Sequence, residues 1–391
     1  MSQAHRIRVP ALALALAVLP PQPGPPGCAE ANPLPKAARA AEVGVSSARL
    51  ERLTRELRRY VADGRLPGGV VLVARRGKVV ALEAFGQRDR EAGAPMREDS
   101  IFRIASQTKA VVSVAALVLQ EEGRLLLSDP VGRYIPEFRE TTVAVPKPEG
   151  GYDVVKAKRQ ITVRDLLTHT SGLGYGGGLA SDRWKAAGIQ GWYFADRDEP
   201  IGATVARMAA LPLESQPGEK WVYGYSTDVL GAVLEKASGE PLDELLGSRV
   251  LDPLGMTDTS FYLPEWKRDR LAVVYSAKPS GGIERAADPG GMEGQGRYVT
   301  GPRRSFSGGA GLLSTATDYA RFLQMLLDGG ILDGKRVLSP SSVRLMTANH
   351  VGSLYPSTWA GGTGFGLAVA VTSDLGARGT PGSAGEYGWG G

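Results

Sequence analysis

Ser106 and Lys109 are the residues of this sequence best suited to covalent chemistry. They are spaced as Ser-x-x-Lys, and an almost wholly apolar run follows at residues 111–119. Such a run predicts a helix buried in a large core, and residues three apart lie on the same face of a helix. A serine becomes a nucleophile when a base takes its proton, and a partly desolvated lysine one turn away can be that base. The pair therefore indicates acyl transfer, with a helix-capping serine followed by a surface lysine as the alternative.

This chemistry needs a large scaffold, and the composition is compatible with one. The 391 residues are 42% hydrophobic and 22% charged, which suits one large or two interleaved globular domains. The net charge is +5, but the basic residues are dispersed. Their densest cluster, residues 50–60, has apolar residues at helical spacing, so its arginines are the solvated face of a helix. We therefore expect no nucleic-acid partner.

The order of the expected elements indicates the fold class. We expect an amphipathic helix over residues 47–62, and then a hairpin of strands at 69–75 and 79–85. Mainly helical sequence with long glycine-rich loops follows at 161–300, and candidate strands return at 309–314, 364–372 and 386–391. Strands at both ends predict an α+β fold, in which one antiparallel sheet is built from both chain ends. Helices flank this sheet, and a mainly helical insertion separates its two parts.

The N-terminus has the pattern of an export signal. Arg6 and Arg8 precede an apolar run at residues 9–19, which is too short to span a bilayer. Ala29 and Ala31 provide an A-x-A cleavage site. We expect a signal peptide at residues 1–31, a loose linker at 32–45 and a hydrolase domain at 46–391.

Cys28 is the single cysteine of the chain. Cleavage after Ala31 removes it with the leader, so that the mature protein has no disulfide. The alternative is a lipidated Cys28 after Gly27, but Pro25 and Pro26 just upstream fit that pattern poorly. We therefore expect a periplasmic or secreted protein without a membrane span.

The chain resembles the serine β-lactamase-like superfamily, in its class C and family VIII carboxylesterase branch. The resemblance extends from about residue 45 to the end, and it rests on five segments in the family's order and at about its spacing. These are Ser106-Gln107-Thr108-Lys109, Leu166-Leu167-Thr168-His169-Thr170-Ser171-Gly172-Leu173, Tyr225-Ser226-Thr227, Ser307-Gly308-Gly309-Ala310-Gly311-Leu312 and Gly388-Trp389-Gly390-Gly391. The resemblance implies the β-lactamase/transpeptidase-like fold and an acyl-enzyme at Ser106.

The resemblance also selects a tyrosine as the partner of Lys109. Alignment through Ser226 and the Val-Leu-Gly that follows favours Tyr225, with Tyr223 as the rival. A phenol has a pKa near ~10, and a nearby ammonium favours the phenolate. Tyr225 beside Lys109 would then act as general base and return the proton to the leaving group.

Two departures from the β-lactamase pattern favour an ester as substrate. In the resemblance to class C β-lactamases, Thr227 takes the place of the asparagine in their Tyr-x-Asn motif. Trp389, Gly390 and Gly391 take the place of their Lys-Thr-Gly motif. The lysine of that motif pairs with the substrate carboxylate, and tryptophan carries no charge. We expect these four residues to contact a short-chain ester. A β-lactamase or D-alanyl-D-alanine carboxypeptidase is the first alternative, and an inactive binding or sensor homologue is the second.

Other kinds of hydrolase fit the sequence less well. A Ser-His-Asp enzyme of the α/β-hydrolase type needs Gly-x-Ser-x-Gly, and the nearest segment, at residues 381–385, begins with proline. The three histidines are His5, His169 and His350; we expect His169 to brace a loop. With so few histidines and one cysteine we expect neither metal nor cofactor. The expected partner is a small-molecule ester or amide, and no pattern selects an oligomeric state.

The resemblance further implies more chain after Trp389-Gly390-Gly391, namely the rest of that strand, another strand and a terminal helix. In the family one oxyanion donor is the N–H of the residue after this motif. We therefore expect the chain to be incomplete at its C-terminus and poorly active as it stands.

Overall fold

The computed structural model describes residues 33–288, 291–356 and 361–391. The expected leader at residues 1–31, with Cys28, lies outside the described residues and stays a prediction. The described residues belong to one compact unit. Among the described residues, no helix has the length and apolar character needed to cross a membrane.

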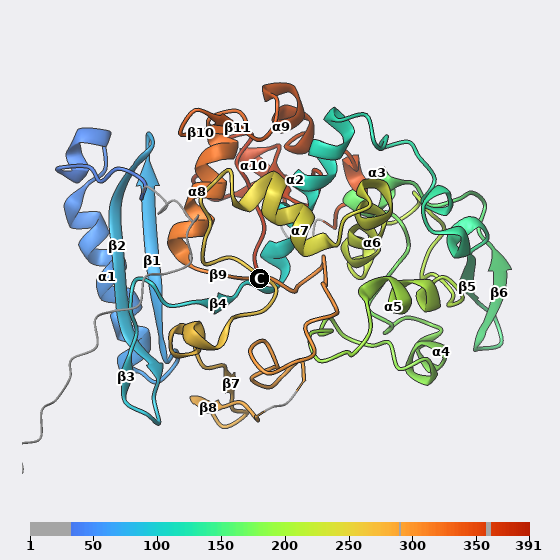
Figure 1. The fold of residues 1–391 in the computed structure, drawn as a ribbon, viewed down its shortest axis with the longest axis horizontal. Coiled ribbons are helices and arrows are strands. Elements are labelled where there is room, and N and C mark those ends of the chain that lie inside the picture. The colour runs from blue at the N-terminus through green and yellow to red at the C-terminus, as the bar shows by residue number, and fades with distance from the viewer. Residues whose placement is uncertain (1–32, 289–290, 357–360) are drawn as a thin grey trace, which may run out of the picture. The chain divides into compact units, whose positions relative to one another are not determined.

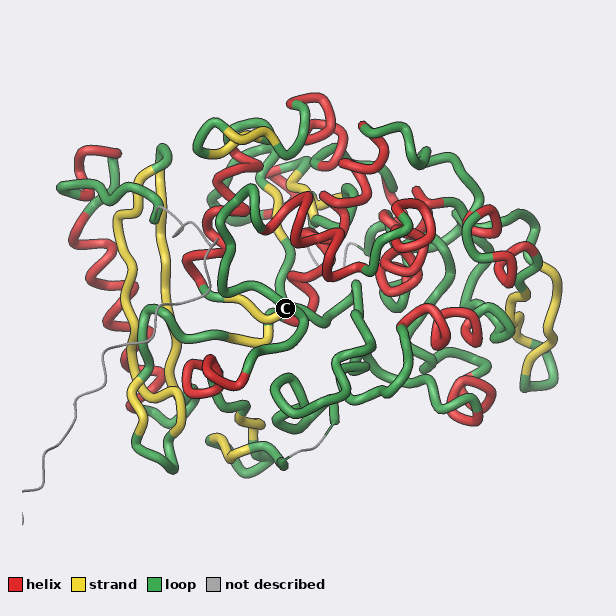
Figure 2. The backbone as a smooth tube through the Cα atoms, viewed as in Figure 1, coloured by secondary structure: helices red, strands yellow, loops and turns green. Residues whose placement is uncertain are grey.

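The helices are short and Figure 2 shows that long loops and turns join many of them. Their bounds are α1 Ser47–Ala62, α2 Thr108–Glu121, α3 Val163–Leu167, α4 Ser181–Ala186, α5 Ile201–Met208, α6 Ser226–Ser238, α7 Leu242–Leu246, α8 Ala316–Leu327, α9 Pro340–Met346 and α10 Leu375–Arg378. The strands are β1 Gly68–Arg75, β2 Lys78–Asp89, β3 Ala94–Pro95, β4 Phe102–Arg103, β5 Thr142–Pro146, β6 Tyr152–Lys156, β7 Tyr275–Ala277, β8 Ile283–Arg285, β9 Leu313–Ser314, β10 Ile331–Leu332, β11 Lys335–Arg336, β12 Thr363–Phe365, β13 Ala370–Thr372 and β14 Tyr387–Gly388. The expected α+β class is confirmed.

The N-terminal helix and hairpin are confirmed within one or two residues, apart from an extension of β2 to Asp89. Strands β1 and β2 pair antiparallel from Gly68 opposite Gly86 to Arg75 opposite Lys78. Arg76 and Gly77 both have positive φ, 53° and 72°, as a two-residue turn that matches strand twist requires. Helix α1 packs against β2, and α8 packs against β1 (Figure 1).

Residues 33–45 are packed on this hairpin, so the expectation of a loose linker is wrong for them. Lys36 bridges Val79 in parallel, and a 3-10 helix spans Ala40–Val43. Leu34 and Val43 are buried. The apolar side chains in this alanine-rich segment therefore add to the core instead of remaining in solvent.

The C-terminal strands differ from the expectation in two ways. Residues 364–372 do not form one strand: β12 and β13 are antiparallel neighbours, because the chain reverses at Ala368, whose φ is 64°. The two chain ends also form separate sheets among the described residues, β1-β2-β3 and β12-β13-β14. The expected single sheet is therefore wrong for this part of the chain, and β4 with β9 is where an N-terminal strand pairs with a C-terminal one.

Helix α2 lies at the centre of the core. Its residues from Thr108 to Leu119 are all buried, and it contacts α6 and α7. Because α2 is covered on all sides, its apolar run shows no amphipathic period. This confirms the expected buried helix after Ser106.

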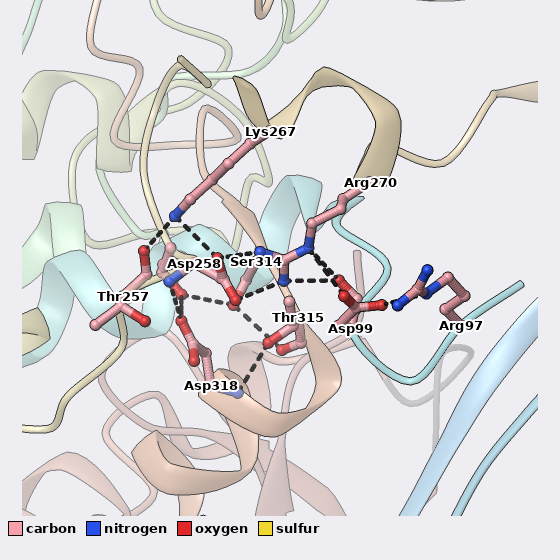
Figure 3. A network of polar contacts seen from close by, with 10 residues as sticks. Arg97, Asp99, Thr257, Asp258, Lys267, Arg270, Ser314, Thr315 and Asp318 are labelled. Atoms are coloured by element: carbon pink, nitrogen blue, oxygen red, sulfur yellow. Dashed lines mark hydrogen bonds and ion pairs between the residues drawn. The ribbon is translucent and has the colours of Figure 1, made fainter. Parts of the chain in front are cut away.

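A polar network fixes the base of β4 and β9 (Figure 3). The guanidinium of Arg270 donates to Asp258 at 2.6 Å and to the carbonyl of Asp99 at 2.8 Å. The carboxylate of Asp318 on α8 accepts the backbone N–H of Asp258 at 2.8 Å, and burial raises the pKa of this carboxyl. The segment before Ser106 is thus anchored to two distant elements.

Asp165 fixes the other loop that leads to the site. Thr162 and Asp165 form a reciprocal capping box at the start of α3. Asp165 also accepts two hydrogen bonds from Arg159, at 2.5 and 2.9 Å, and one from Thr170. Burial opposes ionisation, but these hydrogen bonds and the Arg159 charge prevail and hold the pKa of Asp165 below its ordinary value.

We predict that Asp165→Ala lowers the free energy of unfolding by about 2–3 kcal/mol at pH 7, because the helix loses its cap and Arg159 its partner. The folded pKa is depressed, so this contribution is present above the unfolded pKa of about 4 and is lost as the pH falls through the folded value. Urea unfolding of both proteins at pH 7 and pH 3 measures it. Equal stability at pH 7 would contradict the role assigned to Asp165.

Candidate active site

Ser106 lies in a strand–turn–helix segment that the surrounding structure holds in an unusual conformation. Strand β4 ends at Arg103, a 3-10 turn spans Ala105–Gln107, and α2 begins at Thr108. Ala105 has a φ of 40°, a left-handed conformation that is costly for a residue with a side chain. The carbonyl of Leu312 accepts the N–H of Ile104 at 3.1 Å. Neighbouring backbone therefore fixes the turn that presents the serine.

Lys109 is wholly buried, and its ammonium nitrogen reaches Ser106. The Nζ atom lies 3.1 Å from Ser106 Oγ, 3.2 Å from the Tyr175 hydroxyl and 2.7 Å from the Gly309 carbonyl oxygen. An ammonium has three hydrogens to donate, so these three acceptors satisfy it. The contact expected between Ser106 and Lys109 is therefore present.

The structure brings Tyr223 to Lys109 and keeps Tyr225 away. The Lys109 Nζ atom is 4.7 Å from the centre of the Tyr223 ring. Tyr225 instead donates its hydroxyl to the carbonyl of Gly191 at 2.8 Å and stacks on Trp184, with ring centres 5.6 Å apart. The expected position of Tyr225 beside Lys109 is not observed.

The local backbone explains why the two tyrosines diverge. A Cβ on Gly224 would lie 2.3 Å from the carbonyl oxygen of Leu173, so the chain packs there against the preceding loop. Tyr225 already has helix-like φ and ψ of −72° and 3°, as the residue before α6. Its side chain enters the core, where burial raises the pKa of its phenol.

Tyr175 is a site residue that the sequence analysis missed. It lies in the glycine-rich loop at residues 172–178, and it accepts a hydrogen bond from Lys109. Its ring meets those of Tyr223 and Tyr225 edge-on, at 5.7 and 5.1 Å. Burial, assisted by neighbouring anionic groups, raises the pKa of Tyr175, so it stays a neutral phenol. The signal available in the sequence was an aromatic residue within a loop of glycines.

The last three residues, Trp389-Gly390-Gly391, form the terminal motif, which lies across the Ser106 turn. A Cβ on Gly391 would lie 2.0 Å from the carbonyl oxygen of Ile104, so this glycine passes directly over the turn. The indole N–H of Trp389 donates to the Tyr223 hydroxyl at 3.0 Å. Gly390 lies between them, with no heavy atom within 4 Å of the position its Cβ would take.

Thr227 does not line the site. It is buried in the first turn of α6, and its hydroxyl oxygen has no hydrogen-bond partner among the described residues. Its carbonyl lies 2.5 Å from the position of a Cβ on Gly308. The expected contact of Thr227 with substrate is therefore not supported, because the side chain is enclosed behind the residue 307–311 turn.

His169 has the position expected of a residue that braces a loop. Its φ is 56°, and its carbonyl accepts the N–H of Val222, next to Tyr223, at 2.8 Å. The ring is fully buried, 4.8 Å from the Tyr223 ring centre. Burial holds its pKa well below the usual value, so the imidazole is neutral.

Among the described residues, no cluster of three metal-ligating side chains is present.

Aromatic rings form a wall beside the terminal motif. Trp389 lies edge-on to Phe365 at 5.3 Å and contacts Trp221 at 6.4 Å. Trp221 stacks on Tyr223 at 5.7 Å and meets Tyr355 edge-on. Such a wall favours apolar groups by burying their surface.

The chain is similar in sequence to the β-lactamase family and to known esterases. A family model described as Beta-lactamase matches residues 53–391. Esterase EstB of Burkholderia gladioli is 38% identical over 348 residues, which cover 84% of this chain and 81% of EstB. The lovastatin esterase of Penicillium rubens is 33% identical over 304 residues, covering 75% of this chain and 71% of that esterase.

A solved structure agrees with the fold. EstCE1, described as a hydrolase with promiscuous acyltransferase activity, superposes with a TM-score of 0.76 at 30% identity. The superposition covers 88% of this chain and 87% of EstCE1.

The placement of the two tyrosines leads to a prediction that separates them. Tyr223→Phe should lower kcat for an ester by about 10²–10⁴, the range for loss of a group that moves a proton. Tyr225→Phe should keep near wild-type kcat but lose about 1 kcal/mol of stability, because the half-buried Gly191 carbonyl loses its donor. Steady-state kinetics and thermal unfolding measure both effects. An inactive Tyr225→Phe beside an active Tyr223→Phe would restore Tyr225 as the partner of Lys109.

Proposed function

We propose that this chain, a serine hydrolase that belongs to the β-lactamase family, is a carboxylesterase that hydrolyses short-chain esters through an acyl-enzyme. The observation that carries the proposal is the 3.1 Å contact between Lys109 Nζ and Ser106 Oγ. It places the amino group of Lys109 against the nucleophile inside a buried site, where it can take part in the proton transfer that activation of a serine requires.

The proposed reaction has two halves. Ser106 Oγ attacks the ester carbonyl while its proton passes to the Lys109–Tyr223 pair, and the pair returns a proton to the leaving alcohol. A water molecule then attacks the acyl-enzyme, gives its proton to the same pair, and frees the acid and Ser106. Tyr223 thus takes the role that the sequence analysis gave to Tyr225, because it is the tyrosine next to both Lys109 and Trp389. The Ser106 N–H is proposed as one oxyanion donor.

The neutral wall supports an ester over a substrate with a carboxylate. Trp389 occupies the motif position where the β-lactamase pattern has a lysine, and its indole N–H is used by Tyr223. The names of EstB and of the lovastatin esterase support the same substrate class. A β-lactamase or D-alanyl-D-alanine carboxypeptidase is the second candidate, since it shares the acylation chemistry. The contact of Lys109 with Ser106 argues against an inactive sensor.

Export remains part of the proposal. The basic residues, apolar run and A-x-A site at residues 1–31 support a cleaved leader and a periplasmic or secreted enzyme. Mass spectrometry of the protein from the native host should give a mature N-terminus at residue 32. A diacylglyceryl group on Cys28 would favour the lipoprotein alternative.

Ser106→Ala should abolish hydrolysis of p-nitrophenyl butyrate, because no other group would form the acyl-enzyme. A fluorophosphonate probe should label wild-type protein and leave Ser106→Ala unlabelled, and circular dichroism checks that the variant is folded. Wild-type turnover by a folded Ser106→Ala protein would exclude Ser106 as the nucleophile.

The aromatic wall predicts a substrate preference. We expect kcat/KM for p-nitrophenyl butyrate to exceed that for benzylpenicillin by at least about 10²-fold, the order of discrimination when a charged group has no partner. Parallel assays with the same enzyme preparation measure the ratio. Efficient penicillin turnover with negligible ester hydrolysis would favour the β-lactamase alternative.

A further inference from the structure

Asp228 is a buried carboxylate for which the proposed reaction has no direct use. It lies in the first turns of α6, one per cent exposed. Its Oδ1 atom accepts the Ser307 hydroxyl at 2.6 Å and the N–H of Gly309 at 3.1 Å. Both donors belong to the turn at residues 307–311, so Asp228 fixes this turn from below.

The same turn supplies an acceptor to Lys109. The Gly309 carbonyl accepts a hydrogen bond from the ammonium at 2.7 Å, the shortest of the three contacts that Lys109 Nζ makes. The N–H and the C=O of Gly309 thus connect Asp228 on one side to Lys109 on the other. A displacement of Asp228 would move the acceptor that orients the lysine toward Ser106.

The turn at residues 307–311 packs so closely on α6 that Gly308 and Gly309 have no room for a side chain. A Cβ on Gly309 would lie 2.3 Å from Asp228 Oδ2, and one on Gly308 would lie 2.5 Å from the Thr227 carbonyl oxygen. Since such distances do not occur between real atoms, both positions require glycine while α6 stays in place. The position of the Gly309 carbonyl is therefore set by Asp228 and the helix that carries it.

Asp228 is also a negatively charged group close to the buried ammonium of Lys109 when it is ionised. Lys109 is buried and its three acceptors are a hydroxyl, a phenol and a carbonyl, which carry no full charge. Burial of an uncompensated ammonium is costly. Burial raises the pKa of Asp228, while the Ser307 hydrogen bond and the Lys109 charge oppose this rise. The other titratable groups that face this pair are His169, Tyr175, Tyr223 and Tyr225.

We propose that Asp228 is the positioning residue of Lys109, which it orients through the Gly309 carbonyl and whose charge it balances from α6. The inference rests on the proposed function, because it concerns how Lys109 activates Ser106. It assigns no contact with substrate to Asp228.

Asp228→Asn tests the charge separately from the shape, because an amide oxygen can still accept from Ser307 and Gly309. We expect kcat for p-nitrophenyl butyrate to fall by about 10–100-fold, with KM changed far less because substrate binding is unaffected. The pH–rate profile should also differ from that of wild type, because the variant lacks the carboxylate that holds the Gly309 turn against Lys109.

Asp318→Asn is the matched control. Asp318 is also a buried carboxylate whose pKa burial raises, but it belongs to the network below β4 and β9 (Figure 3). Its amide variant should leave the pH–rate profile in place, whatever it does to the melting temperature. A folded Asp228→Asn protein whose kcat and pH profile match those of wild type would overturn the inference, as would equal profile shifts in the two variants.

Ser307→Ala decides the case if Asp228→Asn does not fold. It keeps the carboxylate and removes one of its two donors, so kcat should fall about 5–10-fold, as for one lost hydrogen bond, while the pH profile stays in place. Wild-type kcat in Ser307→Ala would then overturn the inference.

The rate at which a fluorophosphonate labels Ser106 separates this inference from the proposed function. If the wild-type protein is labelled but hydrolyses no ester, the proposed ester substrate is wrong. Slower labelling of Asp228→Asn than of wild type would still support the inference in that case. If wild-type Ser106 is neither acylated nor labelled, the proposed function and this inference both fail.

Discussion

The need to satisfy a buried ammonium organises this site. Lys109 lies in a helix that is covered on all sides, so its Nζ atom has no access to bulk water and must find all its acceptors in the protein. The three acceptors come from segments far apart in the sequence: the Ser106 turn, the loop of Tyr175 and the turn of Gly309. The elements around the site are therefore held in position by one side chain, and that side chain also contacts the proposed nucleophile, Ser106.

This constraint explains why the surrounding loops pack so closely against one another. Gly308 and Gly309 let the turn contact α6 directly, and Gly224 lets the tyrosine segment contact the loop after His169. Ala105 and His169 hold left-handed conformations, which persist only where neighbouring contacts over-determine the backbone. Asp165 and the Asp258–Arg270–Asp318 network anchor the segments that lead into these turns.

In the proposed reaction, the wall around Trp389 selects the substrate. The acylation machinery is the same for esters and for β-lactams, so selectivity has to come from groups that contact the rest of the substrate. In the proposed site those groups are aromatic rings, and the indole of Trp389 stands at the position of a cation in the related motif. The relatives named as esterases agree with this reading of the wall.

Elements with strong local signals could be predicted from the sequence alone. The hairpin around Arg76 and Gly77, the amphipathic helix α1 and the buried helix after Ser106 follow from side-chain period and turn residues, and so does the Ser106–Lys109 contact, which spans less than one helical turn. What the sequence could not decide depends on contacts distant along the chain. Tyr223 and Tyr225 are two residues apart and locally equivalent, and the packing of Gly224 against residues 173–174 determines which one meets Lys109. Asp228 has no local signal for its role, and the signal for Tyr175 is only that of an aromatic residue within a loop of glycines. Thr227 lost its expected role because the turn at residues 307–311 packs against the start of α6. The tertiary structure decided these positions, because the acceptors of a buried charge are chosen by proximity in space.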